Sequence, residues 1–361
     1  MRRGIQAAII AVAAVGALAP IDSATIERRF STAFYPRIQQ ILTPLSNAAP
    51  FALFDLLTVG GAAVLVIALV RAVRRARRER SVRPLLATLA TTATAGAVVY
   101  ILFLGLWGFN YRRLPMAERL VMADGAPDSA AVLALGLDAA QRMNMLYTEA
   151  HRIGWHEDPR HDSGLQEAFA FVQQRLGDAP PAVPGRLKRT LYGMYFRWTG
   201  VDGMVNPLAL EVLANPDLLP YERAFVAAHE WAHLAGYAHE AEANFVGWLT
   251  CVRAGLADQY SAWLYLYWQV NGDVGAAERT TLREALDAGP RQDIDAIVDR
   301  LRRGQLPLLR TASWRVYDHY LRANRVEEGV RSYGEVVTLL LRARFEDGWV
   351  PVRRTPASSS R

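Results

Sequence analysis

The chain has 361 residues, a formal net charge of +6 and a single cysteine, Cys251. One cysteine excludes an intrachain disulfide and any cysteine-rich zinc site. Hydrophobic residues make up 52% of the chain, which is high for a purely soluble protein, and the excess lies near the N-terminus. The basic charge is almost all arginine, since Lys188 is the only lysine. The length allows one large domain or two ordinary ones.

Three apolar segments precede residue 110 and are expected to be transmembrane helices of a membrane domain. They cover residues 5–20, 51–70 and 85–108. The last two hold the roughly 20 residues that a bilayer core requires. The first has a basic start and resembles a signal peptide, but Pro20 directly after its "ALA" makes a poor cleavage site. We therefore favour a retained anchor.

A basic loop, residues 71–84, separates the second and third segments. It carries one acid, Glu79, and many arginines: Arg71, Arg74, Arg75, Arg77, Arg78, Arg80 and Arg83. Positive residues stay on the cytoplasmic side of a membrane. The loop and the N-terminus are therefore expected inside, and residues 21–50 and all residues after about 109 outside. A nucleic-acid patch is disfavoured because the run is confined between two spans.

The end of the third segment and the outer domain follow. Trp107, Tyr111 and Arg112 are typical of a membrane–water boundary. Residues 111–348 are expected to form a mainly α domain with a small β element. Helical apolar spacing covers residues 129–150, 163–177 and 220–343. Aromatic and β-branched content favours strands at residues 191–200 and 207–215. Residues 349–361 are expected to be a disordered tail.

Three histidines in the outer domain, His151, His156 and His161, are spaced five residues apart. On a helix each step of five residues rotates the side chain by about 140°, so the three do not share a face. Gly154 and Pro159 lie among them and favour a loop. A metal site at these histidines is therefore disfavoured.

The densest chemistry lies in "HEWAHLAGYAHEAEAN", residues 229–244. His229 and His233 are four residues apart, so both project from one helix face and can share a zinc ion. Glu230 is rotated by about 100° and can act as general base toward a water on that metal. Pro220 suits the first helical turn, and Gly236 suits a left-handed helix end.

A third zinc ligand is needed, and three residues are candidates. His239 would complete the metzincin pattern, but that pattern also needs a downstream methionine turn, and no methionine follows Met204. Glu240 is favoured because Asn244, one turn later, can hold a ligand histidine by a hydrogen bond, as in gluzincins. Glu242 remains the other acidic candidate.

The chain resembles a bacterial family catalogued only as a domain of unknown function, with N-terminal spans and a gluzincin-like, HExxH metallopeptidase-like domain. The matching stretches are "PFALFDLL" (50–57), "LWGFNYRR" (106–113), "YFRWTGVDGMVNPLALEV" (195–212), "AHEWAHLAGYAHEAEANFVGWLTC" (228–251) and "GVRSYGEVVTLLL" (329–341). The resemblance implies a zinc-dependent peptidase-like activity and a zincin-like α+β fold. It implies no substrate. His229, Glu230 and His233 match the HExxH motif of that family directly. Glu240, Glu242 and Asn244 match the acidic stretch that follows the motif.

Together these observations predict a membrane-anchored zinc peptidase whose outer domain hydrolyses peptides or proteins on the outer side of the cytoplasmic membrane. The alternatives are a non-catalytic, zinc-stabilised envelope scaffold and a hydrolase of another amide or ester. Residues 194–199 or 208–213 are candidates for a sheet edge that binds substrate. Candidate donors to a developing oxyanion lie in late helices: Tyr317, His319, Tyr320 and Tyr333. The substrate and the oligomeric state are not predicted.

Overall fold

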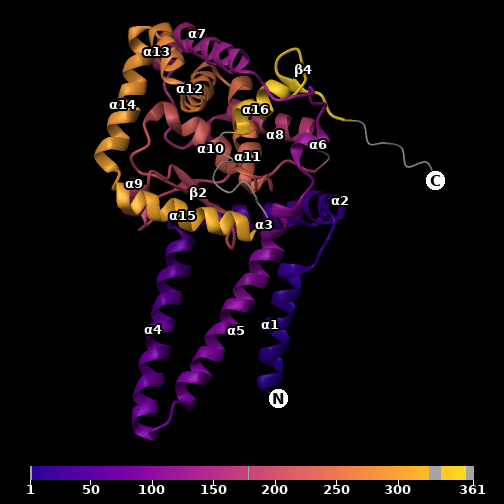
Figure 1. The fold of residues 1–361 in the computed structure, drawn as a ribbon, viewed down its shortest axis with the longest axis vertical. Coiled ribbons are helices and arrows are strands. Elements are labelled where there is room, and N and C mark those ends of the chain that lie inside the picture. Colours follow the sequence, from indigo (N-terminus) through magenta and orange to yellow (C-terminus); the bar gives the residue numbers. More distant parts are fainter. Residues whose placement is uncertain (1, 178, 325–334, 355–361) are drawn as a thin grey trace, which may run out of the picture.

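A stem of three long helices projects from one side of a larger helical domain (Figure 1). The structure, a computed structural model, describes residues 2–177, 179–324 and 335–354. The described part is mainly helical with a small sheet element, which confirms the coarse fold class predicted from the sequence. The stem helices are α1 (Arg2–Leu18), α4 (Leu53–Glu79) and α5 (Arg83–Leu106).

Two stem helices are long and apolar enough to cross a membrane, α4 and α5. They correspond to the second and third predicted spans and are joined by a turn at Arg80, which adopts a left-handed conformation. The first predicted span is α1, which packs against α5. It counts as a third candidate only when residues 4–18 are joined to residues 23–48 across a bend of 106°.

The segment between the first two predicted spans belongs to the larger helical domain. It forms α2 (Ser23–Thr25), a π-helical segment η1 (Ile26–Phe34) and α3 (Tyr35–Ala48). Its buried polar side chains are bonded to the domain: Gln39 bonds both the N–H and the C=O of Val183, and Thr43 donates to the C=O of Leu210. Residues 23–48 thus build part of the larger helical domain, whereas the sequence-based division assigned all residues up to 110 to the membrane domain.

Helices make up most of the remaining domain. In chain order they are η2 (Gly108–Arg112), α6 (Met116–Arg119), α7 (Ser129–Ile153), η3 (Pro159–His161), α8 (Ser163–Leu176), α9 (Gly193–Thr199), α10 (Pro220–Leu234), α11 (Glu240–Arg253), α12 (Leu256–Asp273), α13 (Ala276–Ala285), α14 (Ala288–Gly304), α15 (Pro307–Ala323) and α16 (Glu335–Arg342). The predicted helices at 129–150 and 163–177 are confirmed as α7 and α8, and helices recur through the described part of 220–343.

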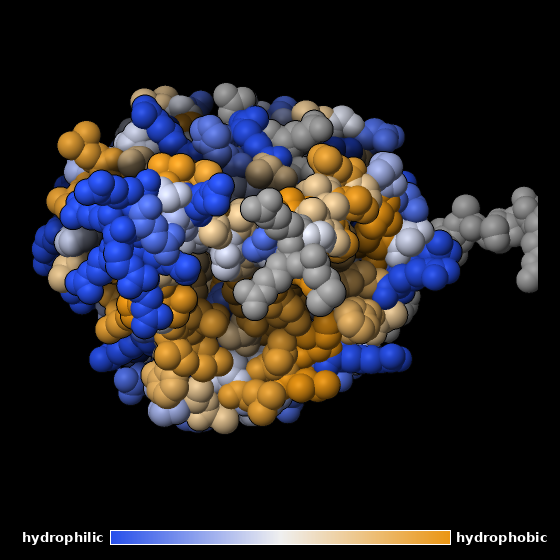
Figure 2. All heavy atoms as spheres, turned by 90° about the horizontal axis from the view of Figure 1, so that it is seen from below, coloured by the Kyte–Doolittle hydropathy of each residue, from blue (hydrophilic) through white to orange (hydrophobic). Residues whose placement is uncertain are grey.

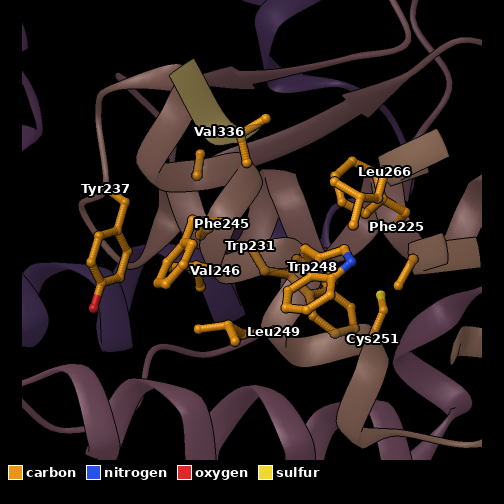
Figure 3. Close-up of a cluster of buried hydrophobic side chains, with 14 of the residues drawn as sticks. Phe225, Trp231, Tyr237, Phe245, Val246, Trp248, Leu249, Cys251, Leu266 and Val336 are labelled. Atoms are coloured by element: carbon orange, nitrogen blue, oxygen red, sulfur yellow. The ribbon is translucent and has the colours of Figure 1, made fainter. Parts of the chain in front are cut away.

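The core of the domain surrounds α10 and α11. Figure 3 shows Trp231 of α10 beside Phe245 and Trp248 of α11, and all three side chains are fully buried. Trp248 also meets Trp263 of α12 edge to face, with ring centroids 5.3 Å apart. Burying large aromatic rings supplies much of the free energy of folding, so the core anchors the two helices that carry residues 229–244.

A three-stranded sheet lies beside α10. Its strands are β1 (Leu187–Lys188), β2 (Gly203–Asn206) and β3 (Glu211–Ala214), in the order β1-β3-β2. Within it β1 runs parallel to β3, with Leu187 opposite Val212, and β2 runs antiparallel, with Val205 opposite Val212. The predicted strand at 207–215 is confirmed at 211–214. Strand β2, at an edge of the sheet, lies between the two stretches predicted as strands and was not predicted.

The predicted strand at 191–200 is wrong, because most of that stretch is helix α9. Its buried residues are Gly193, Phe196 and Thr199, which recur every three positions as on a helix. Gly200 then ends the helix with a φ of 71°. The high aromatic content of the stretch concealed this period, since Tyr195 and Trp198 are exposed rather than buried.

The C-terminal boundary of the domain lies later than predicted. β4 (Phe345–Glu346) pairs with β5 (Val350–Pro351), and the Trp349 ring meets Trp248 with centroids 5.0 Å apart. Residues 349–354 are therefore part of the fold rather than of a tail, because an aromatic side chain there completes the core. The rest of the predicted tail, residues 355–361, lies outside the described residues.

Candidate metal centre

Helix α10 presents the two histidines of the motif. It starts at Pro220, and Glu222 accepts a hydrogen bond of 2.8 Å from the N–H of Leu219, which satisfies the helix start. Gly236 follows the helix with a φ of 85° and turns the chain back, as predicted. Because His229 and His233 are one turn apart, their rings lie side by side, with centroids 4.7 Å apart.

Helix α11 returns across α10 and brings Glu240 to the histidines. Gly247 allows this approach, because a Cβ at that position would lie 3.0 Å from the backbone N of His229. Glu240 Oε2 lies 3.4 Å from His229 Nε2 and 3.5 Å from His233 Nε2. Among the described residues, these three form the one group of side chains whose spacing suits a metal ion.

The two distances from Glu240 Oε2 to the imidazoles are close to the separation of two ligands in a zinc site. With bonds of about 2.0–2.1 Å at tetrahedral angles, two zinc ligands lie roughly 3.3–3.4 Å apart. A charge-assisted N–H···O bond would be shorter, about 2.7–2.9 Å. Glu240 Oε2 is moreover buried and makes no hydrogen bond with the described residues. The donor set, two imidazoles and a carboxylate, is one that zinc enzymes use.

The two kinds of ligand shift each other's pKa. Burial would raise the pKa of Glu240, but the adjacent imidazoles of His233 and His229 outweigh it and lower that pKa well below its usual range. Burial lowers the pKa of His233, but the Glu240 carboxylate outweighs this and raises it to about 9. The cluster therefore favours a shared positive charge, whether a proton or a metal ion.

One ligand histidine is oriented by the backbone. His233 Nδ1 lies 2.7 Å from the C=O of Tyr237. In the neutral tautomer that N–H donates to this carbonyl, which leaves the Nε2 lone pair directed at Glu240 and available to a metal. By contrast, His229 Nδ1 is buried without a hydrogen-bond partner in the described chain.

The two other candidates for the third ligand lie elsewhere. Glu242 Oε1 accepts a hydrogen bond of 2.6 Å from the N–H of Met116, and its Oε2 lies 3.9 Å from Arg119. It therefore anchors α6. His239 is the residue before α11, and its ring meets Tyr111 edge to face at 6.3 Å. The geometry thus favours Glu240, as the one-turn spacing argument does.

The predicted contact from Asn244 to His229 is not formed. Asn244 is buried at the cavity, but its Nδ2 has no partner among the described residues, and neither has His229 Nδ1. Tyr317 of α15 holds a ligand instead, because its hydroxyl donates a hydrogen bond of 2.5 Å to Glu240 Oε1. Sequence reasoning had named Tyr317 as a possible oxyanion donor, but spacing alone cannot connect residues 77 positions apart.

Glu230 lies beside the histidines at the wall of a cavity of about 810 Å³. Its Oε2 is buried and unpartnered in the described part of the chain. Burial raises the pKa of Glu230, an effect that the nearby His229 and His233 reduce. A carboxylate with a raised pKa and no competing hydrogen bond at that oxygen can accept a proton from a molecule in the cavity.

The other residues considered from the sequence are not brought to this site. His151 Nε2 lies 2.8 Å from Asp293 Oδ2, and His161 belongs to η3. Neither is part of a group of described residues that could hold a metal ion. His319 is exposed and its Nδ1 lies 2.7 Å from the C=O of Arg315. Tyr320 does line the cavity. Tyr333 lies outside the described residues.

Residues from the N-terminal third of the chain hold the end of α10. Trp107 Nε1 donates to the C=O of His233 (2.9 Å), the Tyr35 hydroxyl to the C=O of Leu234 (2.7 Å), and Arg113 to the C=O of Gly236 (2.9 Å). Trp107 and Tyr111, which were expected at a membrane–water boundary, are buried within the fold. The clustering of aromatic and basic residues in "LWGFNYRR" could have indicated these contacts. Hydropathy alone, however, does not distinguish side chains at a membrane–water boundary from side chains packed in a core.

The chain belongs to the family described as "Protein of unknown function (DUF3810)", whose model matches residues 30–341. The match covers the second and third predicted spans and the residues of the candidate metal centre. No curated protein and no solved structure matches the chain.

Proposed function

We propose that the protein is a membrane-anchored zinc peptidase of the gluzincin type. The observation that carries the proposal is the convergence of His229, His233 and Glu240 at zinc-like distances beside a large cavity. Glu230 lies next to them, and its Oε2 has no hydrogen-bond partner among the described residues. A purely structural zinc site would be closed by four ligands and would need neither the cavity nor Glu230.

The residues of the site then have separate roles. When bound, zinc supplies a Lewis acid that polarises a carbonyl and activates water. Glu230 accepts the proton of the attacking water and passes it to the leaving amine. His233 is held in position by the Tyr237 carbonyl, and Glu240 by the Tyr317 hydroxyl.

Strand β2 supports a peptide as the substrate. It is an edge strand of the sheet and lines the cavity through Gly203, Met204 and Val205. It passes so close to Glu230 that a Cβ at Gly203 would collide with that carboxylate. An extended peptide can add to such an edge through backbone hydrogen bonds, which would place a peptide bond near Glu230. This arrangement of an edge strand beside the motif helix is the zincin-like feature that we propose for the fold.

For localisation we propose that α4 and α5 cross the cytoplasmic membrane and that the catalytic domain is extracytoplasmic. The basis is the run of arginines at the end of α4 and in the following turn, which favours the cytoplasmic side for that end. The opposite ends of both helices meet the domain (Figure 1). The domain then lies on the outer side.

Metal analysis combined with one substitution tests the proposal. The detergent-solubilised chain is expected to retain about one zinc per molecule, and Glu230→Gln to keep that zinc while losing hydrolysis of a casein substrate, because Glu230 is a base and not a ligand. Loss of zinc in Glu230→Gln would contradict its role. Full activity in Glu230→Gln would exclude the peptidase mechanism. Zinc without hydrolysis of casein or of a mixed peptide library would favour the zinc-stabilised scaffold.

A further inference from the structure

Exposed apolar side chains gather on the side of the domain from which the stem projects. They belong largely to α9 and α15, which pack together: Tyr195 Oη lies 2.6 Å from Ser313 Oγ, and the N–H of Leu306 donates to the C=O of Trp198. In Figure 1, α15 runs across the upper ends of the stem helices. Figure 2 views the molecule from below, with the stem toward the viewer, and shows many hydrophobic residues on this side, those of the stem helices among them.

Helix α15 has the pattern of a helix that lies in a membrane surface. Leu308 and Val316 are 87% and 71% exposed. Successive residues turn by about 100°, so these two share one stripe with the exposed side chains of Leu309 and Tyr320. Arg315 borders the stripe and is exposed. An apolar stripe with a basic border is typical of helices that bind anionic lipid surfaces in their plane.

The apolar surface is continuous with the two helices that are long enough to span a membrane. The ring of Phe54, in the first turn of α4, meets Tyr192 beside α9, with centroids 5.4 Å apart. The ring of Phe103, in the last turn of α5, meets Tyr320 of α15 at 6.5 Å. When α4 and α5 cross a bilayer, α9 and α15 therefore lie at its surface.

The cavity of the candidate site reaches the same surface. Tyr195, Val316 and Tyr320 line it and are also exposed, so they mark where it opens. Phe54 and Trp107, at the domain ends of α4 and α5, line it as well. The cavity thus connects the zinc-like cluster with the domain ends of the two spans.

We propose that the site takes its substrate from the membrane surface: the substrate is an apolar segment of a membrane-inserted polypeptide, which enters the cavity beside α15. This inference rests on the proposed peptidase function. A segment that leaves the bilayer in an extended form has unpaired backbone groups, and the edge of β2 inside the cavity can satisfy them. The apolar rim accommodates its side chains.

The position of α15 is tested without any assay of activity. A fluorophore is attached to cysteine in Leu308→Cys, in a Cys251→Ser background and in nanodiscs that contain phosphatidylglycerol. Val64→Cys, in α4, and Glu284→Cys, in α13 at the opposite end of the domain, are the references. Lipids with a nitroxide group are expected to quench the labels at 308 and 64 but not at 284. A label at 308 that behaves like the label at 284 would overturn the proposal.

The substrate class is tested with two probes in the same nanodiscs. One is a polyleucine span followed directly by eight randomised residues, and the other carries a long Gly-Ser spacer before the same residues. Both are confined to the membrane, so only the distance of the cleavable segment from the bilayer differs. We expect the first to be cleaved at least about tenfold faster, because the spacer dilutes the segment at the cavity mouth.

Each outcome has a separate meaning. Equal cleavage of both probes would overturn the proposed route while the peptidase function stands. Cleavage of neither probe by the zinc-loaded chain would overturn the peptidase function and the inference with it. Leu308→Asp, which changes the lipid-facing stripe but no residue of the cavity, should reduce cleavage of the direct probe and leave the bound zinc unchanged.

Discussion

At the scale of single residues, the third ligand is decided by where each candidate side chain is already bonded. Glu242 is bound to the Met116 N–H, so its carboxylate is not free to reach the histidines. Glu240 lies near both imidazoles, and its second oxygen is held by Tyr317. The two acids are only two positions apart, but the helix turns by about 200° between them, so their partners differ completely.

We predict that Glu240→Gln weakens zinc binding by more than about 100-fold, which exceeds the usual effect of outer-shell partners. The glutamine amide can still accept the Tyr317 hydrogen bond, so the helix should remain folded. His239→Ala and Glu242→Gln are the matched variants and should bind zinc nearly as the wild type does. Competition with a chromophoric chelator measures all three.

Substitution of a residue that hydrogen-bonds a zinc ligand should have an intermediate effect on zinc binding. Tyr317→Phe removes the hydroxyl that orients Glu240 and should cost roughly 10–100-fold in zinc affinity or activity. If His239→Ala were instead the most damaging of these variants, the metzincin-like ligand set would be correct and Glu240 would not be the third ligand.

Zinc affinity should depend on pH through His233. Burial lowers the pKa of His233, but Glu240 raises it to about 9, so the metal-free side chain carries a proton at neutral pH. That proton must leave before Nε2 can bind zinc. We therefore expect apparent affinity to fall about tenfold for each pH unit below this pKa.

The same chelator competition, repeated from about pH 7 to 9, checks the slope. Glu240→Gln lacks the carboxylate that raises the pKa of His233, so its affinity should change less across this range. If the zinc affinity of the wild type did not vary with pH, His233 would not be protonated in the metal-free protein, and this account would be wrong.

At the scale of elements, the site depends on how closely α11 crosses α10. The crossing places Gly247 against the backbone of His229, where a methyl group would be too close. Since neither backbone can yield without moving the core tryptophans, small size at this position sets the separation of the two ligand-bearing helices.

Gly247→Ala should therefore destabilise the protein by about 1–3 kcal/mol through overpacking. It should also weaken zinc binding, because Glu240 would move away from the histidines. The matched control is Gly272→Ala in α12, where a Cβ meets nothing within 4 Å and should be neutral or stabilising by up to about 1 kcal/mol. Thermal unfolding in detergent and chelator competition measure both effects. A Gly247→Ala protein as stable as Gly272→Ala would contradict this account.

At the scale of the whole molecule, the candidate site is built from both ends of the chain. Glu211 on β3 accepts hydrogen bonds from the N–H groups of Leu53 and Phe54 at the start of α4, and it forms a buried salt bridge with Lys188. The stem is thus bonded to the sheet that borders the cavity, and the orientation of the stem determines the side of the membrane on which the site lies.

We predict that the turn between α4 and α5 is cytoplasmic and that the domain is outside. Arg80→Cys and Pro180→Cys, in a Cys251→Ser background, place single thiols at exposed positions on the two sides. A membrane-impermeant maleimide should label position 180 in intact cells and position 80 only after lysis. The reverse pattern would mean that the domain faces the cytoplasm.

The sequence alone determined the features that arise from local periodicity. Four-residue spacing places His229 and His233 on one helix face, and long apolar runs identify α4 and α5, because both follow from the geometry of a single helix. Pro220 and Gly236 bound the motif helix for the same local reason.

Only the tertiary structure decided the features that depend on contacts between distant segments. Tyr317 and Trp107 form hydrogen bonds to the site from distant parts of the chain. Strand β2 becomes an edge strand, and α3 becomes partly buried, only through contacts with segments far away in the sequence. Spacing favoured Glu240 but left Glu242 as an alternative, since both lie in the first turn of α11. That choice depends on the neighbours of each carboxylate, Tyr317 for one and Met116 for the other, and packing alone places them.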